Sequence, residues 1–143
     1  MKADGDAQMG ELVGGLHVGR SIAIRGRVKP YPKSFNVDLL MGSSSSSDVA
    51  LSLNPRMNAT SNEVVFGRNS FLSGSWGVEE RKLDKFPFAP GFYFEMKIHC
   101  GANAFTVSVD CVRLLEYEYR VDLDRITHVR VFGDLNLMFV KLK

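Results

Sequence analysis

Apolar and polar residues alternate with a period of two along most of this chain, which is the pattern of half-buried β-strands. The segment 34–40 is the clearest case, with Phe35, Val37 and Leu39 on one face and polar residues between them. No segment of ten or more residues keeps the 3.6-residue period of a helix, so helices are expected to be nearly absent. About eleven short strands with frequent turns favour an all-β sandwich. The main strands are expected at 21–28, 34–40, 49–53, 76–83, 92–100, 104–109, 112–119, 128–132 and 135–142, with another starting at Val64.

Polar and glycine-containing segments mark the ends of these strands. Residues 1–10 are of this kind, which predicts a flexible N-terminal tail in front of one domain over residues 11–143. The polar stretch 57–62 is expected to be a loop. An isolated Gly67 inside a strand predicts a β-bulge.

Two cysteines, Cys100 and Cys111, are too few for a disulfide framework. If 94–100 and 105–110 form a hairpin, the thiols lie at opposite ends of its second strand, roughly 20 Å apart and out of disulfide reach. Free thiols fit a reducing compartment. Cys111 also falls in a two-residue turn, where cysteine poorly adopts the positive φ of a type I′ turn, so strain or a different turn type is expected.

The composition fits one globular domain with a real core. The chain has 143 residues, of which 45% are hydrophobic and 24% charged. A net charge of +2 with both signs interspersed gives no reason to expect nucleic-acid or anionic-membrane binding. No apolar stretch approaches the roughly 20 residues needed to span a bilayer, and no secretory signal is visible at the N-terminus. No His/Cys cluster has metal-ligand spacing, so neither a metal nor a cofactor is expected.

One stretch of the chain carries the candidate binding chemistry. Amides, guanidiniums and carboxylates can bond sugar hydroxyls as donors or acceptors, and an indole can cover the apolar face of a pyranose. Each residue alone is unspecific, since a lone Trp is usually core and an Arg–Glu pair is usually a surface ion pair. As an ordered series, with its first three members on one face of a strand, they point to a neutral polyol as ligand. The series is Ser52, Asn54, Arg56, Asn69, Trp76, Glu79 and Arg81.

This series resembles the galectin signature of a His-x-Asn-Pro-Arg strand, a Val-x-Asn strand and Trp-Gly-x-Glu-x-Arg. Ser52 stands where the family has histidine. The resemblance covers roughly residues 16–142 and includes Phe-Pro-Phe-x-Pro-Gly at 86–91. The segments 33–40 and 68–72 bring it closest to the C-terminal domain of a tandem-repeat galectin. It implies a jelly-roll β-sandwich of antiparallel five- and six-stranded sheets, with a sugar groove on the concave one.

The resemblance also implies a role for each residue. Asn54 and Arg56 are expected to bond the galactose 4-OH and neighbouring oxygens, and Trp76 to stack on the galactose face. Asn69 and Glu79 are expected to bond the 6-OH. The segment before Asn69 is about two residues longer than in the usual pattern, which leaves its register open. The remaining candidate residues of the groove are Arg81, Ser34, Asn36 and Asp38.

These observations predict a non-enzymatic lectin domain that binds β-galactosides of glycoproteins or glycolipids. Weaker or altered selectivity is expected, because the Ser52 hydroxyl ends short of where a histidine nitrogen would lie. The alternative is a galectin-fold protein-interaction module that has lost sugar binding. Ser52 favours this alternative, whereas retention of the other site residues disfavours it.

A glycoside hydrolase is a poorer interpretation of the same residues. It requires two carboxylates facing each other across one bond, roughly 5–10 Å apart. Asp38 can oppose Glu79, but Arg81 beside Glu79 keeps that carboxylate ionised and unfit as a general acid. By resemblance, a homodimer or a second galectin domain is expected as protein partner. A cytoplasmic location is also expected, with signal-less secretion as in other galectins.

Overall fold

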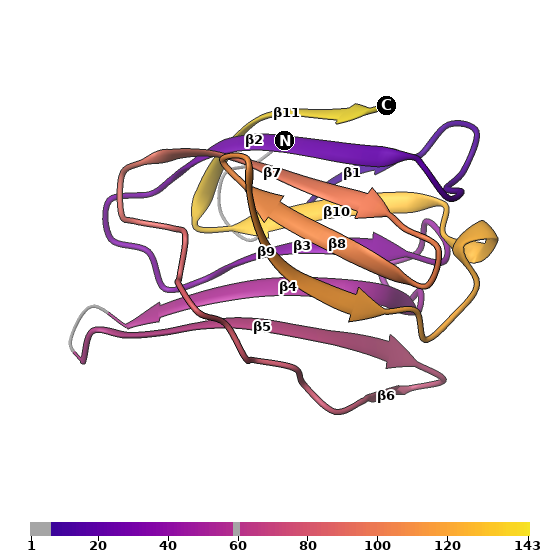
Figure 1. Cartoon of the computed structure of the whole chain (residues 1–143), viewed down its shortest axis with the longest axis horizontal. Helices are drawn as coiled ribbons and strands as arrows, with labels where there is room; N and C mark the ends of the chain where they lie inside the picture. Colours follow the sequence, from indigo (N-terminus) through magenta and orange to yellow (C-terminus); the bar gives the residue numbers. More distant parts are fainter. Residues whose placement is uncertain (1–6, 59–60) are drawn as a thin grey trace.

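The computed structural model describes residues 7–58 and 61–143, and it confirms the expected all-β sandwich (Figure 1). Two antiparallel sheets, one of six and one of five strands, have the orders β1-β10-β3-β4-β5-β6 and β11-β2-β7-β8-β9. A single 3-10 turn, η1 (Leu123–Arg125), is the helical element of the described residues. The strands are β1 (Gln8–Glu11), β2 (Ser21–Val28), β3 (Phe35–Leu40), β4 (Val49–Asn58), β5 (Glu63–Leu72), β6 (Ser75–Trp76), β7 (Tyr93–Cys100), β8 (Ala104–Val109), β9 (Val112–Glu118), β10 (His128–Gly133) and β11 (Leu135–Leu142).

The core lies between the two sheets and follows the predicted alternation. Phe35, Val37 and Leu39 of β3 are all fully buried. The Phe35 ring stacks on Phe94 of the facing sheet with centroids 5.4 Å apart, and Phe88 meets both rings edge-on. Because burying one phenylalanine contributes about 1.5–3 kcal/mol, this aromatic cluster fixes β3, and the polar face behind it, onto the second sheet.

β4 continues through Pro55, past the expected end at residue 53 and into the expected loop 57–62. In the register of β3 and β4, Phe35 lies opposite Pro55. Proline has no N–H to donate to the ladder. The side-chain amide of Asn54 donates to the Phe35 carbonyl instead, at 2.9 Å. The Asn-Pro pair therefore belongs to the strand, because the asparagine replaces the missing ladder bond.

Two further expectations for this sheet are wrong. β5 has no bulge at Gly67, which lies in register opposite Asn54; the β4–β5 register shifts nearer Val49 and Ser52. The strand expected at 76–83 is a two-residue strand, β6, followed by one isolated bridge at Glu80. After Trp76 the chain stays beside β5 through a few separate bonds: Gly77 N–H donates to the Ser70 carbonyl, and Arg68 and Glu80 exchange a pair of backbone bonds.

The N-terminal expectation is wrong for residues 8–10. Gln8–Glu11 forms β1, which pairs with the edge of β10 and places Met9 opposite Arg130. The sequence of β1 contains no β-branched residue, so the pairing comes from the open edge of β10 and not from local strand propensity. Residues 1–6 of the expected tail lie outside the described residues.

Both cysteines are free thiols, as the hairpin argument predicts, with Cys100 buried and Cys111 exposed. In the turn between β8 and β9, Asp110 and Cys111 have φ angles of 51° and 67°. Positive φ at both positions is the type I′ arrangement, so no different turn type forms and Cys111 bears the conformational cost. The Asp110 carboxylate accepts a bond from the Glu95 backbone N–H at 2.9 Å, which holds the turn.

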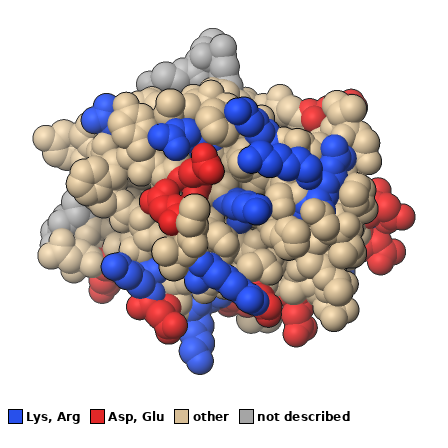
Figure 2. Space-filling view, turned by 45° about the horizontal axis from the view of Figure 1, so that its top comes forward, with Lys and Arg blue, Asp and Glu red and all other residues tan. Residues whose placement is uncertain are grey.

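Charges of both signs are interspersed on the surface. Figure 2, which brings forward the side of the molecule bordered by β11 and β2, shows basic and acidic side chains among each other. No helix within residues 7–58 and 61–143 is long and apolar enough to cross a membrane.

Candidate functional site

Three neighbouring strands present the candidate residues on the outward face of the six-stranded sheet. The register places Asp38 of β3 opposite Ser52 of β4, and Ser52 opposite Asn69 of β5. Two positions along β4, Asn54 lies opposite Gly67. The register of Asn69, open from the sequence, is thereby defined. Because residues two apart share a face, these positions form adjacent rows of one polar surface.

This polar surface is hollowed by a cavity of about 310 Å³. Three expected residues do not line it. Arg81 contacts it through Glu79, Asp38 is buried beneath Ser52, and Ser34 pairs with β4 outside it. The lining residues are Asn36, Ser52, Asn54, Arg56, Gly67, Asn69, Trp76 and Glu79.

One wall of the hollow is an ion-pair cluster centred on Glu79. Arg56 donates to the carboxylate through both terminal nitrogens, at 2.7 and 3.1 Å, and Arg81 donates through Nε at 2.5 Å. The bonds from Arg56 above all, and then Arg81, lower the pKa of Glu79 to about 2, and the carboxylate raises the pKa of Arg56 in return. Glu79 is therefore a fixed, ionised acceptor at neutral pH.

Gly67 leaves a gap among the side chains of β5, and the Glu79 carboxylate fills it. A Cβ at this position would lie 2.2 Å from Glu79 Oε1 and 2.8 Å from Arg56 Nη1. Any larger residue there would displace the ion pair. Gly67 stands two positions before Asn69, where the Val-x-Asn pattern has valine. The chain thus departs from the galectin signature at a second position. The sequence pattern alone explained this glycine as a bulge and not as a change in the signature.

Ser52 is buried, and its hydroxyl is used within the protein. It donates to Asp38 Oδ1 at 2.7 Å and accepts from the Asn36 amide at 3.2 Å. Asp38, only 2% exposed, also receives a bond from Arg130 at 2.8 Å. Position 52 therefore presents an oxygen lone pair to the hollow but no proton.

The two amides beside Ser52 are also bonded within the protein. The Asn54 amide nitrogen donates to the Phe35 carbonyl at 2.9 Å and to Asn36 Oδ1 at 3.0 Å. Its oxygen accepts from Arg56 at 2.9 Å. Because both amide protons are used, Asn54 can meet a ligand only through its remaining lone pair.

Trp76 forms an exposed wall at the sheet edge. It is 54% exposed, which excludes a core role, and its ring meets Phe71 with centroids 5.3 Å apart. The rest of the indole is open to the hollow and can cover the apolar face of a ring-shaped ligand.

Asn69 is held by a residue that the sequence reasoning missed. Arg120, which follows β9 of the other sheet, donates to Asn69 Oδ1 at 3.0 Å. The two residues are 51 positions apart, so no local spacing signals the contact; only the fold brings them together.

The hollow as a whole offers donors, acceptors and an aromatic plate. After the bonds described above, Arg56 and Asn69 each retain an N–H, and Asn54 and Glu79 each retain acceptor capacity. A polyol, whose hydroxyls both donate and accept, matches this mixture. The fixed charges also lower the cost of ordering the site on binding.

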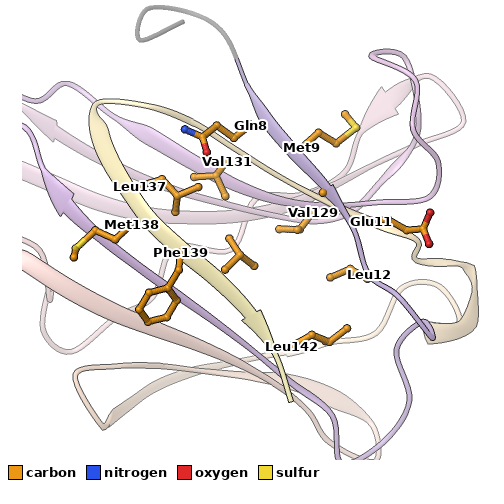
Figure 3. A pocket seen from close by; sticks show the side chains of 12 residues that line it. Gln8, Met9, Glu11, Leu12, Val129, Val131, Leu137, Met138, Phe139 and Leu142 are labelled. Carbon is orange, nitrogen blue, oxygen red and sulfur yellow. The ribbon is translucent and has the colours of Figure 1, made fainter. Parts of the chain in front are cut away.

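A second hollow, of about 290 Å³, lies at the opposite edge of the sandwich between β1, β10 and β11 (Figure 3). Its walls are mainly aliphatic, thioether and aromatic side chains, among them Leu12, Val129 and Phe139. It lacks the clustered amides and ion pairs of the first hollow, so it is no candidate for polyol binding.

A two-sheet sandwich with a polar hollow and an exposed tryptophan is typical of a lectin. The family model of galactoside-binding lectins matches residues 8–142, and the chain belongs to this family, the galectins. It is 44% identical to bovine (Bos taurus) galectin-4 over 134 residues, which are 93% of this chain and 39% of that protein. It is 46% identical to rat (Rattus norvegicus) galectin-8 over 124 residues, 86% of this chain and 37% of that protein.

The chain spans about two fifths of the length of these curated relatives. A solved structure of sheep galectin-11 in complex with glycerol superimposes with a TM-score of 0.84. The match covers 96% of this chain and 98% of the other at 21% identity, and so it shows the shared fold alone.

Proposed function

We propose that this domain binds β-galactosides of glycoproteins or glycolipids in the polar hollow, with weaker or altered selectivity than a galectin carrying the motif histidine. Membership of the galectin family supports the ligand class. One observation carries the altered selectivity: the Ser52 hydroxyl donates its proton to Asp38 at 2.7 Å. It has no proton left for a sugar oxygen.

The roles implied by the galectin resemblance fit the available donors and acceptors. Arg56 would donate to the galactose 4-OH and its neighbours, and Asn54 would accept through its free lone pair. Asn69 and Glu79 would bond the 6-OH, one as donor and the other as acceptor. Trp76 would stack on the apolar face of the ring. Arg81 would orient Glu79, whereas Ser34, Asn36 and Asp38 would shape the surroundings of the hollow.

The expected loss from Ser52 is moderate. A neutral hydrogen bond contributes about 0.5–1.5 kcal/mol net, so losing the bond to the axial 4-OH weakens binding roughly three- to tenfold. A bridging water would add an immobilisation cost of up to about 2 kcal/mol. Arg56 and Asn54 would still bond the same hydroxyl, so binding is weakened and not abolished.

The test is Ser52→His, with lactose affinity measured by titration calorimetry. We expect roughly three- to tenfold stronger binding, the size of one added hydrogen bond. Cellobiose, which has an equatorial 4-OH, should not gain in parallel. Ser108→His is the matched control, because Ser108 lies on the other sheet, on β8. If neither wild type nor Ser52→His binds any galactoside at millimolar concentration, the lectin proposal fails and the interaction module takes its place.

We also propose that the domain is not a hydrolase. A general acid must hold a proton near neutral pH, and Glu79 has a pKa of about 2. Asp38 is buried and bonded to Arg130 and Ser52. Release of monosaccharide from lactose by pure protein, abolished in Glu79→Gln, would contradict this.

The protein partner and the location stay proposals. A second copy of the chain or a second galectin domain could pack on the edge strands β1 and β11 and on the apolar hollow between them (Figure 3). Sedimentation velocity over a range of concentrations tests self-association. A cytoplasmic location with signal-less secretion is tested by antibody staining of intact and permeabilised cells.

A further inference from the structure

Arg120 connects the two sheets beside the polar hollow. It follows β9 of the five-stranded sheet, yet its guanidinium bonds three groups on the other side of the sandwich. Nη1 donates to Asn69 Oδ1 at 3.0 Å, and Nη2 donates to the Val78 carbonyl at 2.9 Å and to Glu80 Oε2 at 3.0 Å. We call these contacts the Arg120 bridge. A planar guanidinium with five N–H groups can make such a set of bonds at once, whereas an ammonium on a single nitrogen cannot match its geometry.

The Arg120 bridge rests on a buried base. The guanidinium carbon lies 4.7 Å from the centre of the Tyr117 ring, within the range of a cation–π interaction. Tyr117 is fully buried, and its hydroxyl is 2.6 Å from Ser70 Oγ. Ser70 gives its own proton to the Ala50 carbonyl at 2.7 Å, so the tyrosine is the donor of the pair. The position of Arg120 is therefore defined from below by core residues.

Gly77 makes room for the Arg120 bridge. A Cβ on Gly77 would lie 2.7 Å from Arg120 Nη1 and 3.3 Å from Asn69 Oδ1. The Gly77 carbonyl accepts from Asn69 Nδ2 at 2.9 Å, and its N–H bonds the Ser70 carbonyl at 3.0 Å. The glycine after Trp76 is thus explained by the close approach of an arginine from the other sheet.

The bonds to Asn69 determine which end of its amide faces the hollow. Arginine can only donate, so the Asn69 oxygen must face Arg120, and it also accepts from the Ser70 backbone N–H at 2.8 Å. The amide nitrogen lies on the other side, where one proton bonds Gly77 and the second is left for a ligand. Without Arg120, the bonds to Ser70 and Gly77 would still favour this orientation, but the amide oxygen would lose its charged donor and the side chain would be held less firmly.

We propose that Arg120 is a positioning residue of the sugar site: together with the Ser70 and Gly77 backbone it holds Asn69 as a donor toward the ligand, and it fastens residues 76–80 beside β5. The expected effect of Arg120 on lactose affinity rests on the proposed function, whereas its expected effect on the Asn69 side-chain amide does not. Arg120 does not line the hollow, so it acts through Asn69 and the segment carrying Trp76.

The test combines Arg120→Met with Arg113→Met as matched control. Both remove one positive charge, but Arg113 lies on the exposed face of β9 and pairs with Glu116. Methionine keeps a stem against Tyr117. In Arg120→Met we expect lactose affinity to fall about tenfold, the effect of one lost preorganised hydrogen bond. The side-chain NH₂ signals of Asn69 in ¹⁵N NMR should shift even without sugar. Arg113→Met should change neither measurement.

Two further variants make the result decisive. Arg120→Lys keeps the charge but should not restore the Asn69 signals. Arg120→Lys also replaces Arg120→Met if that variant does not fold. Gly77→Ala should displace the guanidinium and shift the same signals, but its Cβ would also lie 3.3 Å from Asn69 Oδ1, so it supports the inference only beside an Arg120 variant. Asn69 signals that stay in place in the Arg120 and Gly77 variants overturn the inference, as does unchanged lactose affinity when wild type binds. If the signals move but wild type binds no galactoside, the positioning role stands and the proposed function fails.

Discussion

The two sides of the polar hollow are built on different chemistry. On the side of β3 and of Ser52 and Asn54 on β4, the groups lining the hollow are neutral: Ser52 and Asn36 bond each other and the buried Asp38. On the other side, Arg56 at the far part of β4 and Arg81 after β6 hold the ionised Glu79, and Trp76 of β6 is more than half exposed. The hydroxyl and amide groups of the neutral side donate their protons to other protein groups. The charged groups of the other side are held in place by their ion pairs and are still open to solvent.

This difference separates affinity from selectivity. A fixed carboxylate with arginines around it costs little to order and makes charge-assisted bonds, which are stronger than neutral ones. Most of the binding free energy should therefore come from the charged side. The neutral side holds Ser52 and Asn54, two of the three positions to which the galectin resemblance assigns recognition of the 4-OH, and these two offer lone pairs but no protons. We expect it to contribute little affinity and weak discrimination between epimers.

The largest effect should come from breaking the charged side with Glu79→Gln. Glutamine presents one acceptor and an NH₂ group, so one of the two nitrogens of Arg56 faces another donor. Hydrogen bonds to charged groups contribute about 1.5–3 kcal/mol, so lactose affinity should fall by about 10- to 100-fold. Titration followed by Trp76 fluorescence measures this. Glu95→Gln, which weakens an ion pair with Arg25 on the other sheet, should leave affinity unchanged.

The same pair gives a pH dependence with a defined sign. The pKa of folded Glu79 is lowered from 4.5 to about 2, mainly by its bonds from Arg56. A group whose folded pKa is lowered stabilises the fold above its unfolded pKa, and this stabilisation is lost as pH falls toward the folded value. The melting temperatures of wild type and Glu79→Gln should therefore converge between about pH 4.5 and pH 2. A gap that stays constant over this range would contradict the ion pair.

Local patterns in the sequence predict the sandwich and the groups lining the hollow. Alternation placed Phe35 and its neighbours in the core, and the spacing from Ser52 to Glu79 brought the candidate residues to one surface. Asn54 is a residue whose role such patterns do not predict. The Asn-Pro pair is typical of a turn, but here the Asn54 amide replaces a ladder bond to β3, and this is visible only once the two strands are paired.

Contacts between distant segments could not be predicted in this way. Gly67 is a glycine because a carboxylate from another segment lies over it, and a rule for single strands predicts a bulge instead. Arg120 comes from the opposite sheet. The Ser52 hydroxyl donates to Asp38 because that carboxylate is buried beside it, and the burial of Asp38 cannot be predicted from the sequence pattern.

A smaller effect should follow from Gly67→Ala, which disturbs the charged side without removing a charge. The new methyl group would lie where Glu79 Oε1 now is, so the carboxylate must move away from Arg56. We expect the Glu79 pKa to rise from about 2 toward its ordinary value. Both displaced atoms are ends of flexible side chains, and alanine is less costly in a strand than glycine by about 0.5–1 kcal/mol. The strand preference for alanine should therefore offset only part of the stability lost with the Glu79–Arg56 bonds, which leaves a small net loss at neutral pH.

Carboxyl ¹³C NMR during an acid titration measures the Glu79 pKa in both proteins. Gly26→Ala is a contrasting control, because its Cβ would meet a backbone oxygen at 3.0 Å and the Phe94 ring at 3.3 Å. That variant should lose stability and leave the Glu79 pKa unchanged. An unchanged Glu79 pKa in Gly67→Ala would show that the ion pair tolerates a side chain at this position.

The smallest effect on affinity should come from Ser52→Ala on the neutral side. The hydroxyl proton already belongs to Asp38, so its removal takes only one lone pair from the hollow. We expect lactose affinity to change by less than about threefold, within the lower limit of one neutral hydrogen bond. The cost should appear in stability instead, because Asp38 is buried and keeps Arg130 as its remaining strong partner. Leaving a buried acceptor without its donor costs about 1–3 kcal/mol.

Chemical denaturation and lactose titration of Ser52→Ala, with Ser108→Ala as control, separate the two effects. Ser108 lies on the other sheet and should change neither quantity. A tenfold loss of affinity with unchanged stability would mean that the Ser52 hydroxyl donates to the sugar, so that the neutral side recognises the ligand directly. A loss of stability with nearly unchanged affinity would show that Ser52 supports Asp38. Ser52→His would then add a new contact to the site, because no serine–sugar bond is there to be replaced.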